Sequence, residues 1–322
     1  MLAITMGDAN GVGPEILLRV AAAGGFAGDE TVYGDRAVLA WAAARLGMGA
    51  EVVDRIRIVD QGLLEEHDVA PGKVDGRVGA AALEYVRRAT HDALEGEVSA
   101  VVTLPVNKEA CRVSTPDFTG HTELIAALCG NPAVTMMLAS DRLIVTHVST
   151  HVSLSQAIAR ATTARIADVI RLTHAAVRLL RPRARIAVAG LNPHAGENGA
   201  FGAEDDERIK PAVDAARNEG IDVTGPVPGD TVFYQAVHAG RYDAVVCMYH
   251  DQGHIPMKTL DFDGGVNVTL GLPIVRTSVD HGTAYDIAYR GEARTRSFEL
   301  ALEMGRRLSG EAGHDGRSPS RR

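Results

Sequence analysis

Short apolar runs alternate with longer amphipathic stretches along most of the 322-residue chain. The apolar runs are typical of strands buried in a sheet, and the longer stretches have the periodicity of helices. We predict strands at residues 2–6, 31–33, 57–59, 100–104, 186–189 and 244–248, and helices at 14–23, 37–46, 78–94, 161–180 and 204–217. This alternation predicts an α/β protein with a largely parallel sheet.

Two pairs of apolar runs have no helix between them. Residues 134–138 and 143–148 flank a short polar segment at 139–142, which predicts a hairpin. Residues 266–270 and 274–277 flank Gly271-Leu-Pro273 in the same way. We therefore expect some antiparallel strands within the sheet.

Three apolar runs are each followed by a histidine, and these are His151, His194 and His250. Strand ends in open α/β sheets are common binding sites, and neutral imidazole is a common metal ligand. The three rings could converge on one divalent metal. Each could equally be an ordinary surface or hydrogen-bonded histidine, and the residues alone leave both interpretations open.

A second histidine pattern lies beside His250. His250 and His254 have the i, i+4 spacing of a zinc pair on one face of a helix. Gly253 and Pro256 argue against a helix at this place, because both residues disfavour helix interiors.

Two carboxylates could support a metal site. Asp251 follows His250 directly, and Asp230 precedes Thr231 and an apolar run. Either could orient a ligand histidine through a hydrogen bond. Either could instead serve a turn or a cap, and Asp230 has the pattern of a helix N-cap.

Several polar residues adjoin predicted strands, and a bound anion would explain them. Buried lysine and arginine need a partner, so a carboxylate or phosphate ligand is one interpretation. Salt bridges to some of the 41 acidic residues are the other. The residues concerned are Lys108, His121, Thr122, Lys258, Asn267 and Arg276.

The loop at residues 7–14, GDANGVGP, joins a predicted strand to a predicted helix. Its glycine spacing fits neither the dinucleotide-binding pattern nor the P-loop. We predict a tight turn here rather than a phosphate cradle.

Charge and cysteine usage exclude several classes of partner. The net charge of −8 and the isoelectric point near 5.8 argue against nucleic acid or a membrane surface as partners. We find neither a signal peptide nor a transmembrane segment. The cysteines, at 111, 129 and 247, are odd in number and lack CxxC spacing, which favours a reducing, cytoplasmic location. We expect the polar tail at 311–322 to be disordered.

Seven motifs occur in order along the chain: GDANGVGPE at 7–15, PVNKEA at 105–110, GHTE at 120–123, LNPHAGE at 191–197, GDTVF at 229–233, YHDQG at 249–253 and GVNVTLGLPIVRTSVDHGT at 265–283. Together they resemble the 4-hydroxythreonine-4-phosphate dehydrogenase (PdxA) family, and the resemblance covers residues 2 to about 305. Seven ordered motifs are far more specific than any one glycine loop.

The resemblance implies an NAD-dependent oxidation of a secondary alcohol followed by loss of carbon dioxide. In pyridoxine biosynthesis, 4-phospho-hydroxy-L-threonine would give 3-amino-2-oxopropyl phosphate. The implied fold is similar to isocitrate and isopropylmalate dehydrogenases, with two α/β/α domains and a cleft between them. Residues 1–125 plus about 275–310 would form the first domain, and residues 126–274 the second, with the metal and dimer contacts.

The resemblance also implies site residues and a homodimer that shares its metal site across the interface. Zinc suits three imidazoles best, with magnesium or cobalt as alternatives. Carried over by motif, the metal ligands are His151, His194 and His250; the substrate contacts are His121, Thr122, Lys258, Asn267 and Arg276; and the carboxylates near the metal are Asp230 and Asp251. The general base stays open between Asp251, a histidine off the metal and water, and the NAD contacts are unassigned.

One departure from the family pattern bears on the substrate. Vitamin B6 members usually have leucine at the position of His254. The histidine looks more like the branch that oxidises D-threonate or D-erythronate 4-phosphate to dihydroxyacetone phosphate, and like carboxylated cis-dihydrodiol dehydrogenases. Retention of Lys258, Asn267 and Arg276 favours a phosphorylated substrate over a diol. A non-catalytic metabolite-binding protein is disfavoured, because the metal histidines and Asp251 are all present.

Overall fold

One mixed sheet runs through the whole molecule in the computed structural model, which describes residues 1–262 and 264–310. Its strand order is β3-β2-β1-β4-β11-β10-β5-β6-β9-β7-β8. The strands are β1 Leu2–Thr5, β2 Glu30–Gly34, β3 Ile58–Asp60, β4 Ala100–Thr103, β5 Thr135–Ala139, β6 Ile144–His147, β7 Ile186–Ala189, β8 Val223–Val227, β9 Ala244–Cys247, β10 Val266–Leu270 and β11 Val275–Ser278. The tail predicted to be disordered lies outside the described residues.

The antiparallel pairs lie together in the middle of the sheet. β10 pairs antiparallel with β11 and with β5, and β5 pairs antiparallel with β6. The other neighbours in the sheet pair in parallel. The predicted hairpin and the second predicted antiparallel pair are both confirmed.

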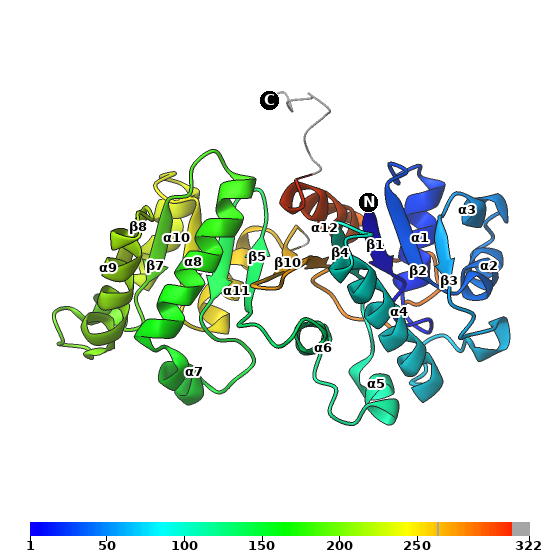
Figure 1. Ribbon diagram of the computed structural model, residues 1–322, viewed down its shortest axis with the longest axis horizontal. Helices are drawn as coiled ribbons and strands as arrows, with labels where there is room; N and C mark the ends of the chain where they lie inside the picture. Colours follow the sequence, from blue (N-terminus) through cyan, green and yellow to red (C-terminus); the bar gives the residue numbers. More distant parts are fainter. Residues whose placement is uncertain (263, 311–322) are drawn as a thin grey trace.

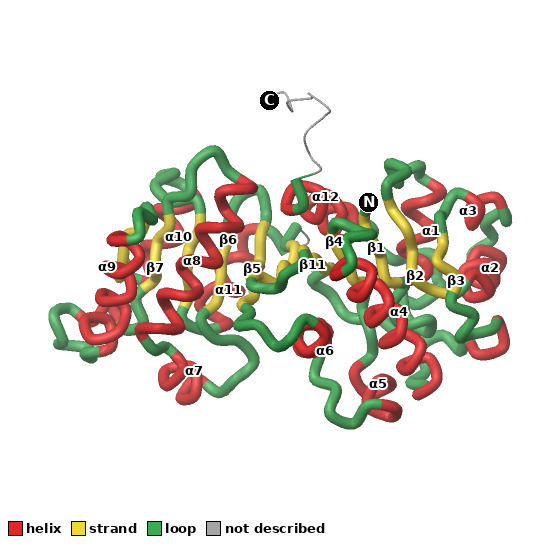
Figure 2. The backbone as a smooth tube through the Cα atoms, viewed as in Figure 1, coloured by secondary structure: helices red, strands yellow, loops and turns green. Residues whose placement is uncertain are grey.

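Helices cover both faces of the sheet. Figure 2 shows the strands of the sheet in yellow with the red helices packed around them. In Figure 1, α8 lies in front of the sheet and α10 behind it. The α-helices are α1 Gly13–Ala22, α2 Arg36–Arg45, α3 Glu51–Asp54, α4 Gly76–Leu94, α5 Lys108–Ser114, α6 His121–Leu128, α7 Leu154–Arg160, α8 Thr163–Leu180, α9 Lys210–Asn218, α10 Gly229–Val237, α11 His250–Leu260 and α12 Arg296–Leu308. Within the described residues, no helix combines the length and apolar character that crossing a membrane requires.

The molecule is elongated, with α12 where its two halves meet (Figure 1). α12 contacts β4, β11 and β10 from the sheet, and α8 from the second half. Strands from residues 2–103 and 275–278 form one half of the sheet, and strands from residues 135–270 form the other. This order supports the division into two domains, which stays a prediction because the sheet is continuous.

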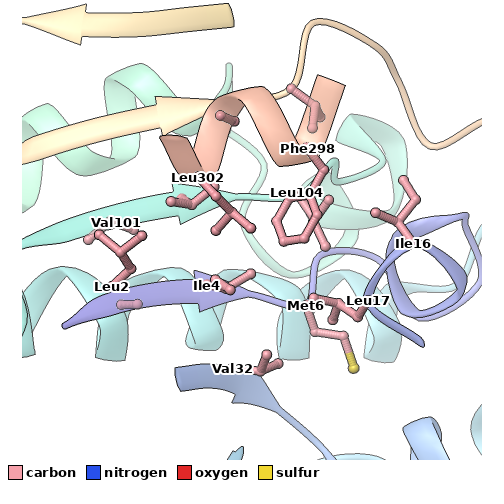
Figure 3. Packing of buried hydrophobic residues seen from close by; sticks show 14 of the residues in the cluster. Leu2, Ile4, Met6, Ile16, Leu17, Val32, Val101, Leu104, Phe298 and Leu302 are labelled. Atoms are coloured by element: carbon pink, nitrogen blue, oxygen red, sulfur yellow. The ribbon is translucent and has the colours of Figure 1, made fainter. Parts of the chain in front are cut away.

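The core of the first half is built around β1. Leu2 and Ile4 on this strand are fully buried. Figure 3 shows them on one side of Val101 of the neighbouring strand β4, with Phe298 and Leu302 of α12 on the other side. Burial of each such side chain stabilises the fold by about 1.5–3 kcal/mol. The C-terminal helix thereby holds β4 and β11, the strands next to the candidate site.

The glycine-rich loop after β1 forms the predicted turn. The Asp8 carboxylate accepts hydrogen bonds from the Asn10 amide and from the Tyr285 hydroxyl, both at 2.8 Å. A Cβ atom on Gly11 would lie 2.8 Å from the Thr283 carbonyl oxygen, so only glycine allows this close approach. The loop is a tight turn packed against the segment that follows β11.

Helices α7 and α10 were not predicted, and three further details of the second half differ from the sequence predictions. His250 to Leu260 form helix α11 despite Gly253 and the internal Pro256. A Cβ atom on Gly253 would lie 2.5 Å from Nε2 of His147, so the glycine lets α11 pack closely on β6. Asp230 is not an N-cap: it lies in the first turn of α10, and Pro228 precedes the helix.

The third difference is β8, which we did not predict. Its sequence, VTGPV, contains a glycine and a proline, and both are rare in strand interiors. β8 is the last strand in the sheet order, and an edge strand tolerates a missing backbone donor.

Candidate active site

A cavity of about 480 Å³ lies over the antiparallel middle of the sheet. Its walls come from segments far apart in the sequence, including the loop into α6, the ends of β5 and β6, and strands β10 and β11. Four of the predicted substrate residues line it, and these are His121, Thr122, Asn267 and Arg276. Lys108 and His151 line the same cavity. The structure therefore brings together residues that are up to 168 positions apart, from Lys108 to Arg276.

Three residues that line this cavity each carry a buried polar atom with no hydrogen-bond partner among the described residues. These atoms are Nε2 of His121, Oδ1 of Asn267 and Nε of Arg276. An unpaired buried polar group destabilises a fold by about 1–3 kcal/mol, so such groups are rare without a reason. Three of them lining one cavity indicate that a polar ligand completes the site.

The charges in the cavity favour an anion. Arg276 is 3% exposed, and burial lowers the pKa of its guanidinium to about 10. Burial, together with the Arg276 and Lys108 charges, lowers the pKa of His121 to about 3. Three cationic side chains, Lys108, Arg165 and Arg276, thus outnumber the two carboxylates of the lining, Glu123 and Asp280. The neutral imidazole of His121 beside them can donate or accept a hydrogen bond. A carboxylate or phosphate bound here would offset the buried positive charge.

Lys258 is connected to this cavity through an ion pair with Asp280. Its ammonium group forms an ion pair with the Asp280 carboxylate, and Asp280 lines the cavity. The Lys258 nitrogen also lies 5.1 Å from the ring centroid of Phe262, which is cation–π distance. Lys258 is not among the cavity-lining residues, so in this structure it lies at the margin of the site.

Two of the three predicted metal ligands lie near one another. His151 follows β6, and His250 begins α11 directly after β9. Their ring centroids are 5.5 Å apart. Nδ1 of His250 is hydrogen-bonded to the Asp251 carboxylate at 2.7 Å, which is the contact expected of a residue that orients a ligand histidine.

The third predicted ligand, His194, lies at a different place in the structure. His194 lines a separate cavity of about 670 Å³ together with Asp230 and Asp251. Over the residues that the structure describes, no group of three or more His, Cys, Asp or Glu side chains is close enough to hold a metal ion. A single chain therefore presents two incomplete parts of the predicted metal site.

The backbone at two of these histidines is unusual. His151 has φ of 47° and His194 has φ of 53°, both in the left-handed region. Residues other than glycine rarely adopt this conformation, and it occurs often at functional sites. The donor set of three imidazoles with nearby carboxylates fits a divalent metal such as zinc.

Two residues that we did not predict hold the His194 loop. Asp205, fully buried in the π-helical turn η3 Asp205–Ile209, accepts hydrogen bonds from the amides of Leu191 and Asn192 at 2.8 and 3.0 Å. Gln252 donates to the Gly190 carbonyl at 2.7 Å and accepts from the Met248 amide at 2.6 Å. The sequence gives no signal for Asp205, which lies in an acidic run at the start of a predicted helix.

A third cavity, of about 540 Å³, adjoins the first. Asp280 and His281 line both of them. The walls of the third cavity carry the apolar residues Val12 and Ile16. Arg19 and Arg296 supply positive charge at the same cavity.

A mixed α/β sheet with an electropositive cavity over its centre is typical of an α/β enzyme for a small anionic substrate. The chain matches the family model described as "Pyridoxal phosphate biosynthetic protein PdxA" over residues 27–305. It is 42% identical to the D-threonate 4-phosphate dehydrogenase of Salmonella typhimurium over 96% of this chain and 98% of the relative. It is 44% identical to the 4-hydroxythreonine-4-phosphate dehydrogenase of Beijerinckia indica over 95% of this chain and 94% of the relative.

A solved structure agrees with these relatives. The crystal structure of 4-hydroxythreonine-4-phosphate dehydrogenase from Klebsiella pneumoniae superposes with a TM-score of 0.86. It is 42% identical and covers 96% of this chain and 99% of its own. The chain belongs to the PdxA family.

Proposed function

We propose that this protein oxidises and decarboxylates a 4-phosphorylated hydroxy acid, using NAD and a divalent metal. The observation that carries the proposal is the electropositive cavity with three unpaired buried polar atoms, on His121, Asn267 and Arg276. A phosphorylated acid supplies several oxygen acceptors and negative charge, which this set of groups can pair. Membership of a family whose named members are dehydrogenases of such compounds supports the same reaction.

In the proposed reaction, hydride passes from the secondary alcohol carbon to NAD, and the alcohol proton is released. The resulting β-keto acid loses carbon dioxide and gains a proton at the carbon that carried the carboxylate. One NADH and one carbon dioxide form for each substrate. The buried Arg276, His121 and Asn267 bind the anionic substrate, and Thr122 adds a hydroxyl to the same wall.

We assign the metal to His151 and His250 of one subunit and His194 of a second copy, with zinc as the favoured ion and magnesium or cobalt as alternatives. A divalent ion held there would supply a Lewis acid beside the reacting carbon–oxygen bond. Asp251 is hydrogen-bonded to His250, so we assign Asp251 the role of orienting the His250 ring. Asp230, a histidine outside the metal set and water are then the candidates for the general base.

A homodimer would complete the metal site. His151 lines the substrate cavity and His194 lines a separate one, and a two-fold axis would bring His194 of one copy to the His151–His250 pair of the other. Large apolar side chains near His194 are exposed: Phe201 is 50% exposed, Tyr234 65% and Ile255 63%. The Phe201 ring lies 6.0 Å from the His194 ring. Exposed apolar groups of this size favour burial against a partner.

The cavity that adjoins the substrate cavity is our candidate for the cofactor. It shares Asp280 and His281 with the substrate cavity, so a ligand in each could approach the other there. Apolar walls suit the rings of a dinucleotide, and Arg19 and Arg296 suit its phosphates.

All three cysteines are free thiols, which supports a cytoplasmic location.

The substrate is either 4-phospho-hydroxy-L-threonine or D-threonate 4-phosphate. The buried His254 favours the second, because it resembles the threonate-oxidising branch at this position. NADH formation by the metal-reconstituted protein on both substrates, side by side, decides between them. Preference for the first places the protein in pyridoxine biosynthesis, and preference for the second in sugar-acid breakdown. NADH from neither, with a carboxylated cis-dihydrodiol oxidised instead, would refute the proposed function.

A further inference from the structure

Two histidines outside the proposed ligand and substrate-binding sets are buried side by side between β6 and α11. His147, the last residue of β6, is 1% exposed, and His254 on α11 is 8% exposed. His147 also lines the substrate cavity. Buried histidine side chains need hydrogen-bond partners, and these two are partners of each other.

The acceptors around the pair favour one tautomer of each ring. Nδ1 of His147 lies 3.3 Å from the carbonyl oxygen of Met136. A carbonyl oxygen only accepts, so His147 donates from Nδ1, and its neutral ring has a lone pair at Nε2. Nδ1 of His254 lies 3.2 Å from that Nε2 atom and 3.1 Å from the carbonyl oxygen of His250. His254 therefore donates from Nδ1 to both acceptors.

The packing leaves the His254 ring in one orientation. Its Nδ1 atom is held by two acceptors, and its ring lies 4.7 Å from the His147 ring, centroid to centroid. Gly253 makes room for the pair, since a Cβ atom there would lie 2.5 Å from Nε2 of His147. A larger residue at 253 would push α11 away from His147.

The fixed ring of His254 lies flat against His250. The two ring centroids are 3.6 Å apart and the ring planes differ by 11°, which is stacking contact. The edge of the His250 ring is held by a hydrogen bond between its Nδ1 atom and the Asp251 carboxylate, at 2.7 Å. The His250 ring is thus constrained from its face by one residue and from its edge by another.

We propose that His147 and His254 act as a positioning pair: His147 fixes the His254 ring, and the stacked His254 ring fixes the orientation of the metal ligand His250. The inference rests on the proposed function, because it takes His250 as a ligand. It adds two residues outside the ligand set that set how tightly the metal is held. Leucine at 254 would fill similar space but offers neither the hydrogen bond nor the flat ring.

The test uses the purified full-length protein, stripped of metal and titrated with Co²⁺, whose visible absorption reports the ligand geometry. The variants are His254→Leu, His147→Leu and the double variant, with His174→Leu on α8 as a control histidine outside the site. We expect His254→Leu to weaken Co²⁺ binding about 10- to 100-fold, as loss of residues behind metal ligands does. The control variant should bind like the wild-type protein.

The double variant tests whether the two histidines act as a unit. If His147 acts only through His254, the double variant binds Co²⁺ no more weakly than His254→Leu alone. The double variant should also melt at a higher temperature than His254→Leu, because the single change leaves the buried Nε2 of His147 without a donor. Equal Co²⁺ affinity and spectrum in all folded variants would overturn the proposal, and so would losses that add independently.

Magnetic resonance of the metal-free protein, labelled in its histidine nitrogens, examines the pair without any metal. We expect both His147 and His254 to carry the proton at Nδ1 and not at Nε2. A proton at Nε2 of either ring would overturn the assignment. If the wild-type protein bound no Co²⁺ at all, the metal assignment in the proposed function would fail, an outcome distinct from variants that match a binding wild type.

Discussion

Arg276 on β11 donates a hydrogen bond from Nη2 to the hydroxyl of Thr103 on β4, at 2.7 Å. Its Nη1 atom donates to the Thr269 hydroxyl on β10 at 3.1 Å, and its Nε atom has no partner among the described residues. The guanidinium is therefore anchored to both neighbouring strands, and its Nε–H and the remaining Nη N–H groups are left for a ligand. This arrangement gives the buried cation a fixed direction in the substrate cavity.

Replacement of Arg276 by lysine tests this relationship. The ammonium group keeps the charge but cannot make these two hydrogen bonds and still direct a third donor at the substrate. A hydrogen bond to a charged group contributes about 1.5–3 kcal/mol, so we expect the KM for the phosphorylated substrate to rise about 10- to 100-fold. Steady-state kinetics measures the change, and Arg142→Lys on the hairpin loop is the matched control. An unchanged KM would mean that Arg276 does not bind the substrate.

Replacement of His194 by alanine should remove tight metal binding and nearly all turnover while the fold stays intact. His194 is exposed in the 3₁₀ turn η2 Pro193–Gly196, so its loss leaves no core cavity. Metal content after dialysis and circular dichroism measure the two effects. Normal activity of this variant in chelator-treated buffer would show that the metal assignment is wrong.

Mixing two inactive variants tests the shared site. If His194 and His250 of one metal site come from different subunits, His194→Ala and His250→Ala subunits can form a dimer with one complete site. Equal mixing after reversible dissociation should then restore roughly a quarter of wild-type turnover, because half of the dimers are mixed and each has one intact site of two. No recovery, with mixed dimers shown to form, would place all ligands in one subunit or demand another assembly.

Acid should destabilise the metal-free protein through His121. Its pKa is lowered from 6.5 to about 3 in the folded chain, by burial first and then by Arg276 and Lys108. Between these values the unfolded chain binds a proton that the folded chain does not, so the free energy of unfolding decreases as the pH falls. The melting temperature of His121→Asn should therefore fall less steeply over this interval. Parallel curves for variant and wild type would contradict the lowered pKa.

Much of the fold was predictable because its signals are local. The runs at 186–189 and 266–270 contain no glycine or proline, and they predict β7 and β10 with the observed bounds. Helix α11 was not predictable from Gly253 and Pro256, because the need for glycine comes from His147, more than 100 positions away in sequence. β8 was missed for a related reason, since only its edge position makes its proline tolerable.

Part of the candidate site was predictable from local motifs, and part depends on the tertiary arrangement. The motifs placed His121, Thr122, Asn267 and Arg276, and the structure brings them into one cavity. That His194 lies in a different cavity from His151 depends on the arrangement of β7, β9 and β6, which no local pattern encodes. Asp205 was not predictable either, because its role depends on two backbone amides of another loop.

The central claim is tested most directly by measuring NADH and carbon dioxide together from D-threonate 4-phosphate and from 4-phospho-hydroxy-L-threonine, each beside its dephosphorylated form. Metal-loaded protein should release equimolar NADH and carbon dioxide from at least one phosphorylated acid, and very little from the form without phosphate. The metal-stripped protein should release neither. Comparable kcat/KM for the dephosphorylated acid, or full activity without metal, would contradict the account.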